Sequence, residues 1–125
     1  MKKLLSFVAV AFMFVACGSY TPKAGDAPDV VAKNCLDGFV KGEIEQVAKC
    51  FQFESENEKQ EFIKELTFKA NVFEKDGGIK SIETNLLFVL ENSAKVKTVA
   101  TFKNGKSFSQ NLDLIKVNNT WYFKK

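Results

Sequence analysis

The chain has 125 residues, with 18 lysines against 15 acidic residues for a net charge of +3, and it contains no histidine and no arginine. A chain of this length forms one small domain. The missing histidine removes the commonest general base and metal ligand, and the missing arginine removes the side chain that binds phosphate through two parallel hydrogen bonds. The composition therefore predicts no metal, no cofactor and no nucleic-acid partner.

The first residues have the three parts of an export signal. Lys2 and Lys3 supply a positive start, and the run from Leu4 to Ala16 is apolar except for Ser6. About 13 apolar residues extend roughly 20 Å as a helix, which is shorter than the roughly 30 Å of a bilayer core. A cleaved signal peptide is therefore favoured over a transmembrane helix.

Cys17 stands at the expected cleavage point. Phe14-Val15-Ala16-Cys17 resembles the bacterial lipobox, although leucine is usual at the first of these positions. The resemblance implies that residues 1–16 are removed and that Cys17 carries acyl chains such as palmitate, which contribute about 0.8 kcal/mol per buried methylene. The alternative is an ordinary signal peptide with a chance cysteine at its end.

We expect the mature chain to be anchored to a membrane and to face the periplasm. The outer membrane is preferred, because Gly18 is not the aspartate associated with inner-membrane retention in some bacteria. Residues 17–27 are expected to be the lipidated cysteine and a flexible tether, since residues 18–26 are small, polar and turn-prone. Residues 28–125 are expected to form a single domain.

The first predicted helix begins at Pro28, a residue favoured in the first turn. Its apolar face contains Val31, Cys35 and Phe39 at four-residue spacing. Gly42 interrupts this helix, and a second short helix is expected from Ile44 to Phe51. The two helices should form a hairpin with their apolar faces toward a shared core.

Cys35 and Cys50 lie on either side of the turn between these helices. Acylation of Cys17 leaves an even number of cysteines in an oxidising compartment, which predicts a disulfide between Cys35 and Cys50. Closing a loop of about 15 residues contributes roughly 3 kcal/mol. Two buried free thiols, acting as small apolar side chains, are the alternative.

A third helix and four strands follow. Ser55 and Glu58 match a capping box, and the helix that they start is expected to end at Asp76-Gly77-Gly78. The strands are expected at residues 79–90, 94–103, 106–117 and 120–124, with hairpin turns at Asn104-Gly105 and Asn118-Asn119. A change of apolar parity between Leu114 and Ile115 predicts a bulge or bend in the third strand. This order predicts an α+β domain with N-terminal helices packed on a curved four-stranded antiparallel sheet.

The order of the motifs resembles small bacterial lipoproteins of a domain-of-unknown-function family, some of which carry a lumazine-binding label. The segments that carry the resemblance are the lipobox, Pro28-x-x-Val31, Phe39-Val40-Lys41-Gly42-Glu43, Ala94-Lys95-Val96, Asn104-Gly105-Lys106, Leu112-Asp113-Leu114 and Asn119-Thr120-Trp121-Tyr122. Beyond the lipobox, the match covers roughly residues 27–125. The resemblance implies a nuclear-transport-factor-2-like (NTF2-like) or cystatin-like fold, and it carries across no catalytic residue.

The predicted function is a non-catalytic module that binds a small apolar ligand or an envelope protein. The chain has 13 phenylalanines, and an apolar pocket would be lined by aromatic side chains. The candidate lining residues are Phe39, Phe88, Phe102, Trp121 and Tyr122, with Phe51, Phe62 and Phe108 as further members. The alternative is that these rings simply fill the core of a small domain.

Two other functions stay open at this point. One is an enzyme of the isomerase or hydrolase type on the same fold, for which Asp113 and Tyr122 are the candidates on strands. Strand parity, however, places Asp113 on the side opposite Leu112 and Leu114, and it places Tyr122 on the side opposite Trp121. The other function is an immunity or inhibitor protein, which needs a partner that one sequence does not show.

Overall fold

The structure, a computed structural model, describes residues 20–75 and 77–125. The predicted signal peptide, Cys17 and Asp76 lie outside the described residues. The elements are α2 (Pro28–Val40), α3 (Ile44–Ala48), α4 (Glu56–Lys75), β1 (Ile79–Val89), β2 (Ser93–Phe102), β3 (Ser107–Val117) and β4 (Thr120–Phe123).

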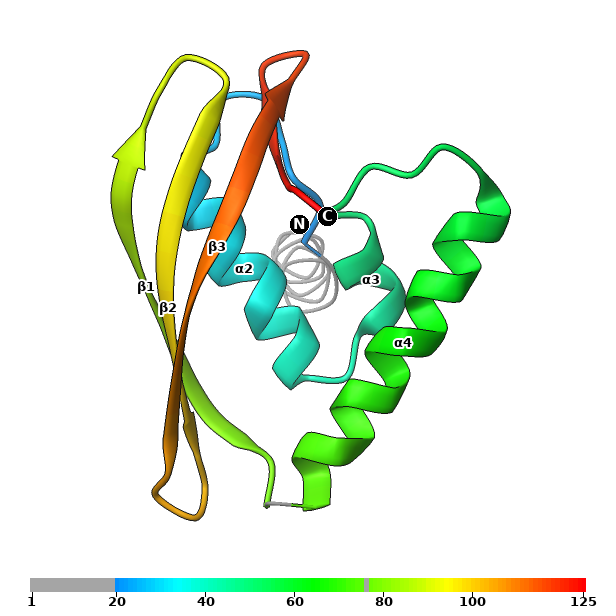
Figure 1. The fold of residues 1–125 in the computed structure, drawn as a ribbon, viewed down its shortest axis with the longest axis vertical. Helices are drawn as coiled ribbons and strands as arrows, with labels where there is room; N and C mark the ends of the chain where they lie inside the picture. The colour runs from blue at the N-terminus through cyan, green and yellow to red at the C-terminus, as the bar shows by residue number, and fades with distance from the viewer. Residues whose placement is uncertain (1–19, 76) are drawn as a thin grey trace, which may run out of the picture.

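The four strands form one antiparallel sheet in the order β1-β2-β3-β4. Figure 1 shows the sheet curling around α2 and α3, with α4 on the side of these helices that is away from the sheet. All three described helices therefore lie on the concave side of the sheet. This arrangement confirms the predicted α+β class and its curved four-stranded sheet.

The core lies between α2 and the middle of the sheet. Its buried residues are Val31, Ala32, Cys35, Cys50, Ala94, Val96, Leu114, Trp121 and Phe123. The four-residue spacing along α2 and the two-residue spacing along β2 bring these side chains together from opposite layers. The concave face is therefore defined by Ala94, Val96 and Leu114, and neighbours paired with them share that face.

The predicted disulfide is confirmed. Cys35 and Cys50 are joined, their Cα atoms are 6.4 Å apart, and both side chains are buried in the core. Cys50 lies two residues beyond the end of α3, because the second helix is shorter than expected. The bond therefore ties α2 to the segment that leads from α3 toward α4.

Helix α4 begins at the predicted cap. The backbone N–H of Glu58 donates to Ser55 Oγ at 3.1 Å, as expected for an N-cap serine. The reciprocal bond to the Glu58 carboxylate comes from the N–H of Glu54 at 2.8 Å, one residue earlier than in a capping box. The bond to Ser55 satisfies an amide of the first turn that has no intrahelical partner, and the bond from Glu54 joins the residue before the cap to that turn.

The predicted bulge in the third strand is wrong. Along the described pairs of β2 and β3, the register runs without a shift from Ser93 opposite Ile115 to Thr101 opposite Ser107. Ile115 lies on the convex face, where it is paired with Tyr122, so its apolar side chain has a cross-strand partner without any bulge. The register shifts occur instead in β1, between Ile79 and Ser81 and between Leu86 and Phe88.

The tether predicted for residues 17–27 is packed against the domain in the part that the structure describes. Tyr20 contacts the core cluster and Pro22 is buried. The Tyr20 hydroxyl donates to Asp26 Oδ2 at 2.7 Å, and the N–H of Gly25 donates to the carbonyl of Asn119 at 3.3 Å. Turn-prone composition predicted flexibility, but these contacts hold the segment on the outside of α2.

Candidate functional site

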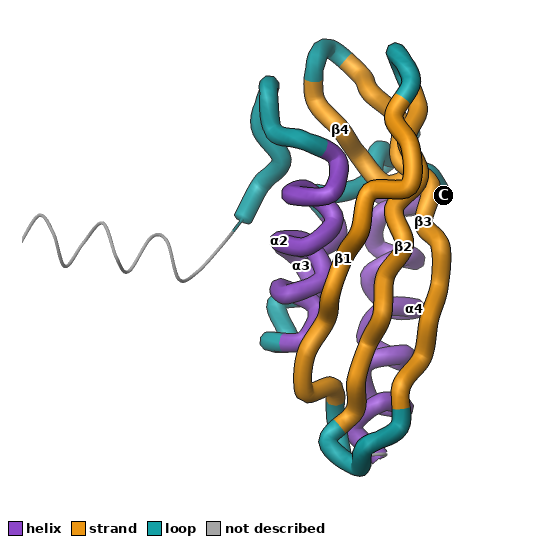
Figure 2. Tube along the Cα trace, turned by 90° about the vertical axis from the view of Figure 1, so that its left-hand side faces the viewer, coloured by secondary structure: helices purple, strands orange, loops and turns teal. Residues whose placement is uncertain are grey.

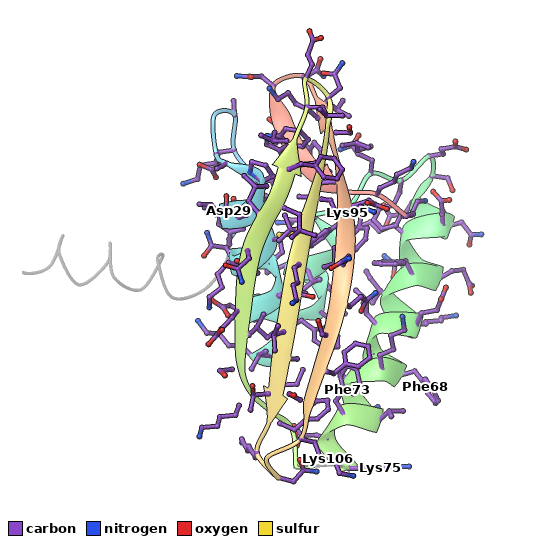
Figure 3. The ribbon with its side chains drawn as sticks, turned by 60° about the vertical axis from the view of Figure 1, so that its left-hand side comes forward. Asp29, Phe68, Phe73, Lys75, Lys95 and Lys106 are labelled. Atoms are coloured by element: carbon purple, nitrogen blue, oxygen red, sulfur yellow. A yellow bond between two sulfur atoms is a disulfide. The ribbon has the colours of Figure 1, made fainter. Side chains whose placement is uncertain are left out.

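Helix α4 stands away from the sheet. None of its 20 residues, all of which the structure describes, is buried. Phe62, Leu66 and Phe73 are half-buried on the side toward the domain, whereas Phe68 is 69% exposed. Figure 3 shows Phe73 directed toward the sheet and Phe68 directed away from it. Such incomplete burial leaves room between α4 and the sheet.

Two aromatic clusters hold α4 at its ends. Near its start the rings of Phe51 and Phe62 are 4.5 Å apart, and Phe53 and Phe123 adjoin them. Near its end the rings of Phe73 and Phe102 are 5.6 Å apart, and Phe39 packs edge-on against Phe73 at 5.9 Å. Aromatic pairs at such distances contribute about 0.5–1.5 kcal/mol each beyond their buried area.

Between the clusters lies a cleft, which we call the α4 cleft. Its main part has a volume of about 330 Å³ and is lined by Leu36, Phe39, Val47, Phe51, Phe62, Glu65, Leu66, Lys69, Gln110, Leu112, Asp113, Phe123 and Lys124. An adjoining part of about 130 Å³ is lined by Leu36, Phe39, Phe73, Ile79, Ile82, Thr98, Ala100, Phe102, Phe108, Gln110 and Leu112. The two parts share four residues, so they form one elongated apolar hollow along α4. Its volume falls in the range of small-molecule sites.

Polar groups of the cleft lie at its mouth or already have partners. Thr98 faces the interior, but its hydroxyl donates to the carbonyl of Gln110 at 2.8 Å. Glu65 and Lys69 on α4, Gln110 and Asp113 on β3, and Lys124 after β4 are exposed and stand at the rim. The interior is therefore suited to an apolar group, and the rim could contact a polar end of the same molecule.

An ion pair fastens the start of α4 to the end of the chain. Lys125 Nζ lies 2.7 Å from Glu58 Oε2 and 4.8 Å from the centre of the Phe53 ring. The hydrogen bond from Lys125, together with the bond from the Glu54 amide, lowers the pKa of the Glu58 carboxyl below its ordinary value. This pair lies beside the first aromatic cluster and helps to position α4.

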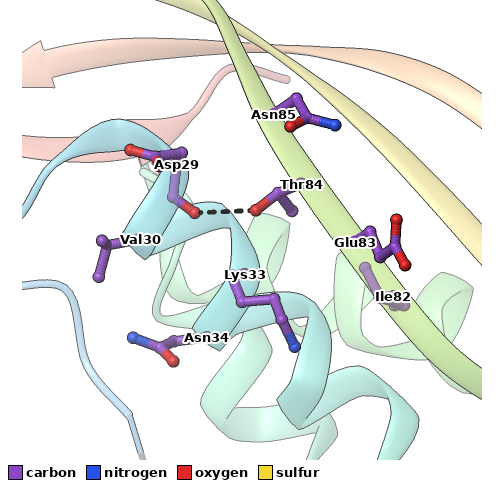
Figure 4. Close-up of a pocket in the computed structure, with 8 residues that line it drawn as sticks. All are labelled: Asp29, Val30, Lys33, Asn34, Ile82, Glu83, Thr84 and Asn85. Atoms are coloured by element: carbon purple, nitrogen blue, oxygen red, sulfur yellow. Dashed lines mark hydrogen bonds between the residues drawn. The ribbon is translucent and has the colours of Figure 1, made fainter.

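A second hollow, of about 530 Å³, lies between α2 and the edge strand β1 (Figure 4). It is lined by Asp29, Val30, Lys33, Asn34, Ile82, Glu83, Thr84 and Asn85. The Thr84 hydroxyl is directed toward the Asp29 carbonyl at 3.4 Å, and Lys33 is paired with Asp37 at 2.9 Å. Val30 and Ile82 are the only apolar residues among these eight, whereas the main part of the α4 cleft has eight apolar lining residues, so the α4 cleft is the better candidate for an apolar ligand.

The structure brings only some of the predicted lining residues together. Phe39 and Phe102 line the α4 cleft, as do Phe51, Phe62 and Phe108. Trp121 is 4% exposed and belongs to the core, with Lys116 Nζ at 5.3 Å from its ring.

Phe88 and Tyr122 lie on the convex face, so their assignment to the pocket is wrong. Tyr122 is opposite Ile115, one residue out of phase with the buried Trp121. Leu86 is opposite the buried Val96, but the bulge that follows sets Phe88 opposite Lys95. Because one extra residue reverses the side on which the next residues point, Phe88 leaves the concave face.

Asp113 lines the edge of the cleft, but its side chain lies on the convex side, as strand parity predicted. Its carboxylate is 3.3 Å from Lys95 Nζ, and the two residues are cross-strand neighbours. Tyr122 points to the same convex face. These two residues therefore do not form an ionisable pair inside the cleft.

Several cleft residues were not among the predicted lining residues. Leu112 and Phe123 are in phase with buried neighbours on β3 and β4. Leu66 and Phe73 follow Phe62 at helical spacing on α4. Periodicity marked all of these as inward-facing, so the missing information was that α4 does not close onto the sheet.

A solved structure has a similar fold. The crystal structure described as "Putative NTF2-like transpeptidase" from Campylobacter jejuni matches with a TM-score of 0.61 and 23% identity, covering 78% of this chain and 97% of that chain. At this identity the likeness shows the fold alone, and it confirms the NTF2-like prediction. No protein-family model and no curated protein matches the chain.

Within residues 20–75 and 77–125, no helix combines the length and apolar character needed to cross a bilayer. In the same residues, no cluster of three or more histidine, cysteine or acidic side chains is arranged to hold a metal ion.

Proposed function

We propose that this chain is a lipid-anchored envelope protein whose NTF2-like domain binds a small apolar ligand in the α4 cleft without catalysing a reaction. The observation that carries the proposal is the apolar hollow of about 330 Å³ beneath a helix with no buried residue. A helix that only completed a core would close over it and bury its inner face. Helix α4 is held at both ends and leaves its middle accessible.

The expected affinity is modest. Burial of about ten methylene-sized groups at about 0.8 kcal/mol each gives about 8 kcal/mol, and the cost of association removes at least about 4 kcal/mol. At most about 4 kcal/mol remains, so the dissociation constant should be about 1 mM or higher. The elongated shape of the hollow favours a chain-like ligand, and the rim, with Lys69 and Lys124 beside Glu65 and Asp113, could contact a polar end.

The test uses two ligand probes with the mature domain, a neutral fluorescent naphthylamine and a medium-chain fatty acid. Saturable binding of the naphthylamine and its displacement by the fatty acid are expected. Leu112→Trp, which replaces an aliphatic side chain of the cleft by a larger indole ring, should abolish the binding of both probes. The matched control is Leu90→Trp, because Leu90 is 61% exposed and lies outside the cleft.

The outcomes separate three readings. Loss of binding in Leu112→Trp with full binding in Leu90→Trp supports the cleft. Loss only in Leu90→Trp would assign the probe to the exposed apolar end of β1. Absence of binding by the parent protein would sink the small-ligand proposal and leave an envelope protein as the partner.

An enzyme on this scaffold is the second candidate, since the similar structure is described as a transpeptidase. Asp113 and Tyr122 do not supply it, because both lie on the convex face. The ionisable residues that line the cleft are Glu65, Lys69, Asp113 and Lys124, and the pair that such an enzyme would use is Glu65 and Lys69, which lie four residues apart on α4. An activity that survives Glu65→Gln and Lys69→Met together would exclude this version of the enzyme.

Support for the anchor comes from the sequence. An apolar run too short to span a bilayer leads directly into a lipobox-like Cys17, which lies outside the described residues. Mass spectrometry of the membrane-fraction protein should find a chain that begins at an acylated Cys17. A mature chain with a free thiol there would remove the anchor and leave the cleft unaffected.

A further inference from the structure

The segment just after the proposed anchor is folded onto the domain. The Tyr20 hydroxyl donates to Asp26 Oδ2 at 2.7 Å, and the Tyr20 ring packs against the buried core. Pro22 is buried, and the Gly25 amide donates to Asn119 in the β3–β4 turn. We call residues 20–27, held by these contacts, the N-terminal latch.

The latch leaves very little chain between the domain and the anchor. Cys17 precedes Tyr20 by three residues, and an extended chain spans at most about 3.6 Å per residue, or about 11 Å here. A tether free from Cys17 to Ala27 would reach about 36 Å. Given the proposed acylation of Cys17, on which this step rests, the surface around Tyr20 lies within about 11 Å of the acylated residue.

The latch lies on one side of the molecule and the cleft opens on another. Figure 2 shows the first described residues on the outer side of α2, whereas β3 lies at the opposite edge of that view. Figure 3 shows Asp29 of α2 and Phe68 of α4 on opposite sides. The lips of the α4 cleft are α4 and β3, with α2 beneath them.

We propose that the N-terminal latch holds the outer side of α2 against the lipid surface, so that the mouth of the α4 cleft faces the aqueous periplasm. Val30, which is 44% exposed beside Asp29, then faces the bilayer, and its apolar side chain suits that position. Charges on this side are mixed, with Lys23 and Lys33 near Asp26 and Asp29. Chain length, and not charge attraction, therefore sets the orientation, which should be insensitive to salt.

The experiment uses the full acylated chain in phosphatidylethanolamine–phosphatidylglycerol vesicles that contain a lipid with a quencher on its headgroup. Val30→Trp and Phe68→Trp are compared as two exposed probes on opposite sides. The native Trp121 is buried and contributes the same background to both. The headgroup quencher is expected to reduce the fluorescence of the tryptophan introduced by Val30→Trp and not that of the tryptophan introduced by Phe68→Trp, at low and at high salt alike.

A tether variant tests the role of the latch. Insertion of about ten glycine and serine residues between Ser19 and Tyr20 gives the domain a flexible connection and should remove the quenching of Val30→Trp. Equal quenching of both probes, or quenching of Val30→Trp that survives the insertion, would overturn the orientation while the anchor stands. A chain that mass spectrometry shows to lack acyl groups on Cys17 would overturn both the anchor and the orientation.

Discussion

The Cys35–Cys50 disulfide makes a quantitative prediction about stability. Replacement of both residues by alanine removes a link that joins α2 to the segment after α3, beneath the α4 cleft. Both cysteines are buried among Val31, Ala32 and Trp121, so alanine avoids placing an unpaired polar group in that core. The double variant should therefore still fold.

The magnitude follows from the length of the closed loop. The two cysteines are 15 residues apart, and a loop of this size restricts the unfolded chain by about 3 kcal/mol. Small domains have unfolding free energies of about 5–15 kcal/mol, so the loss is a large fraction of the total. At roughly 4 °C or more per kcal/mol, the melting temperature should fall by at least about 12 °C.

Urea denaturation of the mature parent, the reduced parent and the double variant measures this loss. The reduced parent and the double variant should agree closely, because both lack the same restriction on the unfolded state. Alkylation of the parent without reductant should label no thiol once Cys17 is acylated. A double variant within about 1 kcal/mol of the oxidised parent would refute the loop-entropy reasoning.

Three further predictions concern single side chains. Ser55→Ala should cost about 1 kcal/mol in a urea titration through loss of the cap on the Glu58 amide, and an unchanged midpoint would contradict the cap. Lys125 lowers the pKa of Glu58, so the ion pair between them stabilises the fold at neutral pH. This stabilisation is lost as the pH falls through the lowered pKa of Glu58. Carboxyl NMR should show this pKa rising in Lys125→Ala, and no change there would exclude the pair in solution. Burial and, next in size, the hydrogen bond to Asp26 raise the pKa of Tyr20. The protonated Tyr20 hydroxyl therefore stabilises the fold fully below the ordinary pKa of a phenol, and this stabilisation is lost as the pH rises through the raised pKa of Tyr20. Ultraviolet titration should show a late phase that Tyr20→Phe removes, and a parent protein without that phase would refute the burial.

Local sequence determined the elements and their turns. Asn118 and Asn119 adopt positive φ angles of 51° and 65°, and Gly105 adopts 94°, as tight hairpin turns require. The four-residue spacing on α2 and the alternation on β2 likewise define faces that any packing must bury. These features depend on neighbours within a few residues, so a single sequence is enough to predict the α+β order. The pairing of Cys35 with Cys50 was inferred instead from the even number of cysteines that remain after acylation of Cys17, with two free thiols as the alternative.

Tertiary structure decided the site. Periodicity shows which side of α4 faces the domain, but the gap beneath it depends on the rings of Phe62 and Phe73 meeting partners from other elements. The apolar run from Leu86 to Leu90 is compatible with either face, so nothing in it marked the bulge that turns Phe88 outward. Residues 20–27 look flexible by composition, and only the contacts of Tyr20 with Asp26 and the core reveal a latch. The cleft and the latch depend on the distances between elements far apart in the sequence. Packing across the whole fold sets these distances, and local sequence patterns do not encode them.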